Sequence, residues 1–260
     1  MIDSRGRVRG ITAVADGTHH RIEADIVIGA DGLHSTVAAH VSARSVVEGL
    51  HAAGTLYSYW ENLPVDGYYW KFQPGASIGA IPTNDGATCV FAGVPSGGFR
   101  SEVRGDASSA FRRVVREVSS AFDARLDEAR QVEPVRGFGG HAGFIRRASG
   151  DGWALVGDAG YFKDPATAHG ITDALRDAEL LARAIIKGTT AAFDDYERTR
   201  NDLSSRMFEV TDQIASFAWT EAELQSLHRA FSTEMSREVR ALAALEPFPS
   251  LLPAGASHVA

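Results

Sequence analysis

One carboxylate in this chain stands where a fold can hold a large anionic ligand. Asp158 follows Gly157 directly after residues 153–156, a short unalternating apolar run that is typical of a strand covered on both faces. Apolar residues then recur at helical spacing up to a stop at Gly188, at Ile171, Leu175, Ala178, Ala182 and Ile185. The amides of a helix that begins near Gly170 point back toward the loop that carries Asp158. This arrangement suits a phosphate or an electron-rich ring.

A second carboxylate ends another predicted strand. Residues 25–29 are apolar after Asp25, and Asp31 and Gly32 follow them, with Ser35 and Val37 farther along. Asp31-Gly32 can equally be a simple turn, because Asp and Gly dominate turns for local reasons. Asp158 has a similar alternative role as a helix cap, although a carboxylate directly after a buried strand needs hydrogen-bond partners or water. Both aspartates are therefore candidates for ligand contact.

The two segments together resemble the group A FAD-dependent flavoprotein monooxygenases, the aromatic hydroxylase family. Gly157-Asp158-Ala159, Pro165, Gly170 and Asp177-Ala178 fall at the spacing of the family's Gly-Asp motif. Residues 24–37 are similar to its Asp-Gly motif and lie upstream, as they do in the family. The pair in this order indicates the family more strongly than either segment alone.

The resemblance implies an α/β fold in which a Rossmann-like FAD-binding domain contains an inserted antiparallel-sheet substrate domain and is followed by a helical region. It implies cofactor-binding roles for Asp31, Gly32, Gly157, Asp158, Pro165, Gly170 and Ile171. Asp31 would lie near the ribose and pyrophosphate, Asp158 would hold a ribityl or ribose hydroxyl, and Pro165 would shape the loop beside the reactive face of the ring. The amides near Gly170 and Ile171 would stabilise negative charge on the reduced ring.

The activity that the resemblance implies is the insertion of one oxygen atom into a small organic substrate, with FAD as cofactor and NAD(P)H as reductant. No side chain can be named as a catalytic acid or base. Two alternatives stay open. One is a flavin-dependent reductase or halogenase of the same fold, and the other is a catalytically silent fragment or accessory subunit that cannot hold FAD alone.

The second alternative is motivated by a missing pattern. The family opens with a strand-GxGxxG-helix unit that binds the ADP pyrophosphate, and no such pattern precedes Asp31. We therefore expect an N-terminally truncated FAD-binding domain, with an unpaired sheet edge near Ile26 and Leu155. An open apolar edge favours association with another chain, either in a homo-oligomer or with a separate chain that supplies the missing unit.

Composition excludes several other classes. The 260 residues carry a formal net charge of -7, whereas a nucleic-acid surface needs a clustered excess of Lys and Arg. Cys89 is the only cysteine, so no internal disulfide or multi-thiolate metal site can form, and the cytoplasm is the default location. The histidine spacing predicts no metal site, and no apolar run has membrane-spanning length.

The remaining elements divide the chain into four parts: residues 1–44 and 149–192 for the cofactor domain, 45–148 for the substrate sheet, and 193–260 for a helical region with a tail from Glu246. Asp16-Gly17 predicts a hairpin, and residues 55–94 read as an antiparallel meander. Asp106 can cap a helix running to about Phe122. The strand aromatics could line a substrate pocket or simply pack: Tyr57, Tyr59, Trp60, Tyr68, Tyr69 and Trp70.

Two further motifs are declined on context. The segment from Gly137 to Ala142 fits G-x-G-x-x-A, but it lacks the strand before it and the helix after it that a dinucleotide fingerprint needs. The segment from Gly75 to Gly79 fits the nucleophile elbow around Ser77, yet Pro82 forbids an immediate helix.

Overall fold

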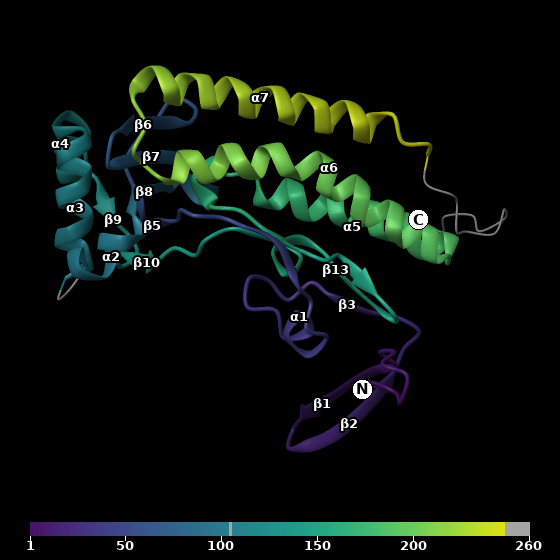
Figure 1. Cartoon of the computed structure of the whole chain (residues 1–260). Helices are drawn as coiled ribbons and strands as arrows, with labels where there is room; N and C mark the ends of the chain where they lie inside the picture. The colour runs from purple at the N-terminus through teal and green to yellow at the C-terminus, as the bar shows by residue number, and fades with distance from the viewer. Residues whose placement is uncertain (104–105, 248–260) are drawn as a thin grey trace, which may run out of the picture.

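The computed structural model describes residues 1–103 and 106–247, so most of the tail expected beyond Glu246 lies outside the described residues. Figure 1 shows a large sheet covered on one face by α3 and α4, and three long helices, α5 to α7, that run together away from it. The hairpin β1–β2 projects at the other end of the molecule. The fold is therefore mixed α/β, as the sequence predicts.

A short parallel pair of strands places the two candidate carboxylates at one edge. Strand β3 (Val27–Gly29) runs parallel to β13 (Trp153–Leu155), with Gly29 opposite Leu155. Parallel strands end on the same side of a sheet, so Asp31 and Asp158 both emerge there. Strand β12 (Ser149–Gly150) pairs with the other edge of β13, so the unpaired edge expected near Leu155 is not found. Within the described residues β3 has no second neighbour.

The N-terminal hairpin is confirmed. Strands β1 (Gly10–Ala15) and β2 (Thr18–Glu23) pair in antiparallel fashion around Asp16 and Gly17, whose φ angles of 51° and 72° are those of a tight hairpin turn. Helix α1 (Thr36–His40) follows β3. A second small sheet joins three distant segments, β4 (Ser45–Glu48), β11 (Phe144–Arg146) and β14 (Tyr161–Phe162).

The large sheet is antiparallel, but its first strand breaks the expected meander. Only β6 (Tyr69–Gln73), β7 (Ala76–Pro82) and β8 (Thr88–Pro95) follow one another in space as they do in sequence. Strand β5 (Ala53–Glu61) pairs with β8 instead of β6. The short strands β9 (Arg130–Gln131) and β10 (Arg136–Phe138) then pair with β5. The prediction was wrong here because turn residues mark strand ends but do not specify the partner of a non-adjacent strand.

Strand alternation gives the large sheet two different faces. Leu56 and Trp60 of β5 are buried in a core with Phe111 of α3 (Ala107–Val118), whereas Thr55 and Tyr57 point to the opposite face. Helix α2 (Ser96–Glu102) follows β8. The single helix expected from Asp106 to about Phe122 is two helices, because Ser119 ends α3 and caps α4 (Ser120–Glu128).

The C-terminal region is helical, as predicted: α5 (Gly170–Lys187), α6 (Thr190–Ala215) and α7 (Glu221–Ala243). Gly188 ends α5 in a left-handed conformation, as expected. The prediction of which face of α5 is buried was wrong, however. Ile171 and Leu175 are 81% and 68% exposed, whereas Asp173, Arg176 and Asp177 are buried. Charged residues are rarely buried unless paired, so an apolar periodicity search assigns the wrong side. No helix in the described ranges is long and apolar enough to cross a membrane.

The declined motifs are ordinary strands. Ser77 lies inside β7, which continues to Pro82, and Gly137 lies inside β10 with the short strand β11 next along the chain. Neither segment has the strand-turn-helix geometry of the motif that it imitates.

Candidate functional site

A pocket of about 550 Å³ lies where β3 and β13 end and α5 begins. Six of the seven residues expected to bind the cofactor line it: Gly32, Gly157, Asp158, Pro165, Gly170 and Ile171. Ala30, Val156, Phe162, Lys163, Ala168 and Ala174 complete the wall. The two motifs, more than a hundred residues apart in sequence, therefore share one cavity.

Asp158 is the polar group best placed to bind a ligand in this pocket. Its side chain is half-buried, and among the described residues no group donates a hydrogen bond to its carboxylate. Burial raises the pKa of Asp158, and the nearby Lys163 cation opposes this shift. A half-buried carboxylate that lacks a protein donor is suited to accept hydrogen bonds from ligand hydroxyls.

The N-terminus of α5 supplies donors to the same pocket. Five other α-helices of the described chain begin with a side-chain cap, at Ser35, Asp106, Ser119, Thr189 and Thr220. His169, the residue before α5, makes no such cap, and both Gly170 and Ile171 line the pocket. The first amides of a helix lack intrahelical acceptors and carry partial positive charge. They are thus available to an electron-rich group in the pocket.

Asp31 is placed at the rim with its oxygens already engaged. Ser35 Oγ donates to one carboxylate oxygen at 2.6 Å, and the Val37 amide donates to the other at 3.1 Å. Partial burial would raise the pKa of Asp31, but these hydrogen bonds outweigh it and lower the pKa. Asp31 therefore fixes the start of α1 and does not line the pocket, although the adjacent Gly32 does.

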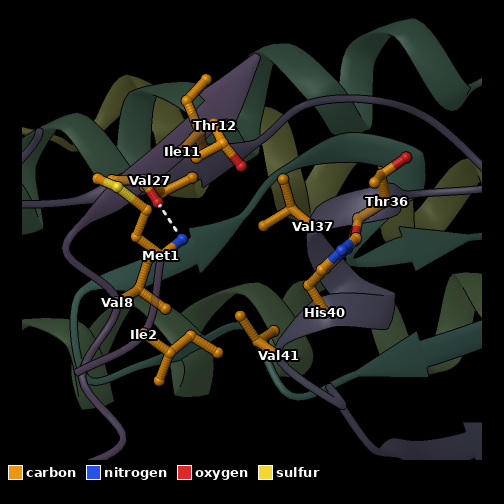
Figure 2. Close-up of a pocket in the computed structure, with 11 residues that line it drawn as sticks. Met1, Ile2, Val8, Ile11, Thr12, Val27, Thr36, Val37, His40 and Val41 are labelled. Atoms are coloured by element: carbon orange, nitrogen blue, oxygen red, sulfur yellow. Dashed lines mark hydrogen bonds between the residues drawn. The ribbon is translucent and has the colours of Figure 1, made fainter. Parts of the chain in front are cut away.

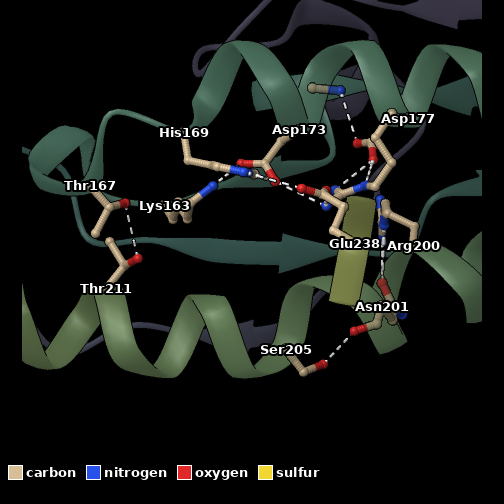
Figure 3. Close-up of polar contacts among 12 residues, drawn as sticks. Lys163, Thr167, His169, Asp173, Asp177, Arg200, Asn201, Ser205, Thr211 and Glu238 are labelled. Carbon is tan, nitrogen blue, oxygen red and sulfur yellow. Dashed lines mark hydrogen bonds and ion pairs between the residues drawn. The ribbon is translucent and has the colours of Figure 1, made fainter. Parts of the chain in front are cut away.

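A buried charge network lies behind the pocket, and Figure 3 labels four of its members, Lys163, Asp173, Asp177 and Glu238. Lys163 pairs with Asp173, and Arg176 binds Asp173 at 3.0 Å, Asp177 at 2.7 Å and Glu238 at 2.8 Å. All five side chains are at most 3% exposed. Burial and the Arg176 cation lower the pKa of Lys163 to about 7. The network was missed in the sequence, where only Asp177 carried a signal, through its family spacing.

Asp177 connects this network to the pocket wall. Its Oδ2 accepts a hydrogen bond from the Gly157 amide at 3.2 Å, while Arg176 holds its other oxygen. Gly157 has a φ of +55°, and a Cβ there would meet Ala174 Cβ at 3.0 Å. Glycine is thus required both by the backbone conformation and by the close approach of α5.

A second pocket, of about 240 Å³, lies on the face of the large sheet opposite α3 and α4. We call it the sheet pocket. Its wall is largely apolar and aromatic, with Tyr57, Trp70, Phe91, Ile81 and Phe217 among the lining residues. Pro165 and Ala168 line both pockets, so the loop before α5 separates two adjoining cavities. A small apolar ligand in the sheet pocket would lie next to a ligand in the Asp158 pocket.

The strand aromatics divide between the two roles left open by the sequence. Tyr57 and Trp70 line the sheet pocket. Trp60 and Tyr69 pack on the helices, stacked on Phe111 and Phe122, and Tyr68 is exposed. The alternation of strand side chains between two faces explains the division.

Asp164 fastens the loop between the pockets to the large sheet. It accepts hydrogen bonds from the Ala53 amide at 2.6 Å and from the Ala166 amide at 2.9 Å. Burial raises the pKa of Asp164 to about 6 in spite of these bonds. Burial also raises the pKa of the Cys89 thiol in the sheet pocket, so Cys89 is not an activated nucleophile.

Another hollow, of about 170 Å³, lies between the hairpin and α1 (Figure 2). Apolar side chains dominate it, including Val8, Val27, Val37 and Val41, with His40 at its side. It lacks the convergent polar groups of the Asp158 pocket, so we place the functional site at the latter.

We expect Gly157→Ala to lower the free energy of unfolding by about 2 kcal/mol, because alanine adds left-handed backbone strain and a contact with Ala174. Urea unfolding measures the change. Gly188→Ala is the matched control, since Gly188 has a φ of +65° but its Cβ would meet nothing nearer than 3.8 Å. An effect of Gly157→Ala no larger than that of the control would contradict the close approach.

The raised pKa of Asp164 predicts a stability change between pH 4 and pH 6. The folded protein binds a proton at Asp164 up to about pH 6, whereas the unfolded chain releases it near 3.8. The free energy of unfolding therefore falls as the pH rises through this window, by up to about 3 kcal/mol. Asp164→Asn should remove this component, as shown by urea unfolding at pH 4.5 and 6.5. Parallel pH profiles for both proteins would show that the pKa of Asp164 is not raised.

Comparisons with known proteins show the family of this chain. The profile of a family described as an FAD binding domain matches residues 3–211. A digeranylgeranylglycerophospholipid reductase of Methanothrix thermoacetophila is 32% identical over 73% of this chain and 49% of the relative. A 6-methylpretetramide 4-monooxygenase of Streptomyces rimosus is 26% identical over 97% of this chain and 58% of the relative. The chain thus spans about half the length of these curated relatives.

Solved structures share the fold. The flavin-dependent brominase Bmp2, as a triple mutant, superposes with a TM-score of 0.70 at 16% identity, over 93% of this chain and 68% of the brominase. The flavin-dependent halogenase CmlS gives a TM-score of 0.66 at 22% identity, over 88% of this chain and 45% of the halogenase. The family profile covers most of the chain, and its matched residues include both motifs that meet in the Asp158 pocket. This chain therefore belongs to the family described as an FAD binding domain.

Proposed function

We propose that this chain holds the ribityl and ring end of FAD in the Asp158 pocket and an apolar organic substrate in the sheet pocket, as part of an NAD(P)H-dependent monooxygenase. One observation carries the proposal: Pro165 and Ala168 line both pockets, so the two ligands would meet across a single loop. An oxygen-transfer reaction requires this proximity between cofactor and substrate.

The residues of the Asp158 pocket fit the cofactor. Asp158 offers a carboxylate without a protein donor to the hydroxyls of the ribityl chain, and Gly157 and Gly170 leave the pocket wall free of side chains. The uncapped amides at Gly170 and Ile171 offer positive charge to the electron-rich end of the ring. We assign Asp31 an indirect role, in which it orders the Gly32 turn at the rim.

When bound, FAD supplies the redox chemistry, and this chain supplies position and environment. Tyr57, Trp70 and Phe91 would clamp a small aromatic or other apolar compound and exclude water from the side of the sheet. Asp164 would keep the intervening loop in place through its bonds to Ala53 and Ala166. We assign no side chain to general acid or base catalysis.

The lysines favour a monooxygenase over a halogenase. A halogenase needs a catalytic lysine facing the substrate, and the lysines of this chain are Lys71, Lys163 and Lys187. None of them lines the sheet pocket, and Lys163 is committed to Asp173 in the buried network. A reductase remains the second candidate, because a relative named as a digeranylgeranylglycerophospholipid reductase is 32% identical over 73% of this chain.

The proposed organisation follows from the same assignment. Residues 1–44 and 149–192 would form the cofactor part, 45–148 the substrate part and 193–260 the helical region, in a cytoplasmic protein. Within the described residues one edge of β3 is unpaired, and a further strand would pair there, either from a second copy or from a separate chain that completes the adenine and pyrophosphate site. If this chain binds no FAD alone, the accessory-subunit alternative becomes the better description.

We expect the purified chain to retain FAD through gel filtration and to show the visible absorbance of protein-bound flavin. Asp158→Ala should weaken FAD binding about 10- to 100-fold, because it removes a charge-assisted acceptor for hydroxyl groups. Flavin fluorescence titration measures the affinity. The matched control is Asp66→Ala, an exposed carboxylate in the turn before β6, which should leave it unchanged. Colourless wild-type protein at saturating FAD would reject autonomous cofactor binding.

We further expect NADH or NADPH to bleach the oxidised-flavin absorbance of the FAD-loaded chain under anaerobic conditions. Dithionite serves as the positive control, since it reduces flavin without a nicotinamide site. Bleaching by dithionite but by neither nucleotide would argue against the proposed reductant, and would leave FAD binding itself unaffected.

A further inference from the structure

Helix α7 makes an unusual contact with the pocket loop. The helix lies beyond residues 3–211, the part that the family profile matches. Its buried residues are Leu224, Phe231 and Glu238. Phe231 and Glu238 are two helical turns apart and therefore lie on one face of α7. Both side chains contact His169. A single charged side chain, Glu238, is buried on this helix.

His169 is held between these two residues. Its ring meets the Phe231 ring edge-on, with centroids 5.7 Å apart, and its Nε2 lies 3.1 Å from Glu238 Oε2. Its Nδ1 lies 3.4 Å from Asp173 Oδ1. His169 is 6% exposed, and Phe231, Glu238 and Asp173 surround its ring.

The contacts of His169 with Phe231 and Glu238 matter because of where His169 lies in the chain. His169 immediately precedes Gly170, the first residue of α5, and follows Ala168. Ala168 has a φ of 50° and a ψ of 36°, a left-handed conformation that costs a non-glycine residue roughly 1 kcal/mol or more. Because Ala168 lines both pockets, any movement of His169 would reshape both cavities.

Glu238 adds a third carboxylate to the buried network, beside Asp173 and Asp177. Arg176 Nη1 lies 2.8 Å from Glu238 and 3.0 Å from Asp173, and Lys163 takes the other oxygen of Asp173. His169, Asp173 and Glu238 could in principle gather around a metal ion. Lys163 and Arg176 already pair with Asp173, and Arg176 also pairs with Glu238, so the arrangement fits a structural tie rather than a cation site.

We propose that Glu238 is a positioning residue through which α7 latches the 163–170 loop, and that this latch sets the affinity of the Asp158 pocket for FAD. The latch itself is a property of the free chain, while its effect on FAD rests on the proposed function. Loss of the Glu238 carboxylate would leave His169 and Arg176 partly unpaired, and the strained Ala168 backbone would then relax.

The test compares Glu238→Gln with Glu234→Gln by hydrogen exchange of the free chain and by flavin fluorescence titration. Glu234 lies one turn earlier on α7 and pairs with Arg237 at its surface, which makes it a matched control. We expect amide exchange in residues 163–172 to accelerate about tenfold in Glu238→Gln and less than about twofold in Glu234→Gln. Exchange in β5 and β8 should not change. The dissociation constant for FAD should rise about tenfold in Glu238→Gln alone.

Each outcome decides a distinct point. Unchanged exchange in residues 163–172, or an equal acceleration in β5 and β8, would overturn the latch. Faster exchange in the loop with unaltered FAD affinity would overturn its link to the cofactor. If the wild-type chain binds no FAD, the proposed function fails. The hydrogen-exchange measurement on the free chain still tests whether Glu238 holds the 163–170 loop. His169→Gln removes the same contact from the loop side and replaces Glu238→Gln if that variant does not fold.

Discussion

The arrangement of this site depends on the compensation of buried charge on α5. Asp173, Arg176 and Asp177 are buried within one turn and a half of the helix, where an unpaired charge would be strongly destabilising. Each therefore needs a partner from another element, and the partners are Lys163, Glu238 and the Gly157 amide. The requirement for pairing thus draws the β13 loop, the 163–170 loop and α7 onto the same helix.

This constraint explains why the pocket has its shape. Gly157 is bound to Asp177 and Lys163 to Asp173, so both ends of the segment 157–163 are tied to α5, and Asp158 lies between them on the pocket wall. The start of α5 has no side-chain cap, and the ring of His169 lies among Phe231, Glu238 and Asp173. A carboxylate and free amides consequently face one cavity. The buried charges of α5 thus position the loop that carries the binding groups of the Asp158 pocket.

The lining of the sheet pocket follows from strand alternation alone. Alternating side chains along β5 send Leu56 and Trp60 to the helices and Tyr57 to the opposite face. Asp164 ties the start of β5 to the loop, so the aromatic face of the sheet closes against Pro165 and Ala168. A loop that is anchored by Asp164 and shared by two cavities can position two ligands without a dedicated catalytic side chain. That is the expected division of labour when the cofactor carries the chemistry.

The sequence by itself determined the local elements and the family, because apolar runs, turn residues and motif spacing act over short stretches. The predictable elements were the hairpin, β3, β13, the end of α5 and the α/β class. Six of the seven proposed binding residues also meet in one pocket, as their positions after strands and before a helix imply. Only the tertiary structure decided the partner of β5, the break at Ser119, the exposed face of Ile171 and Leu175, and the contact of Glu238 with His169. Strand partners and buried ion pairs join residues far apart in sequence, and the free energy of such a contact depends on a complete environment that no local pattern records.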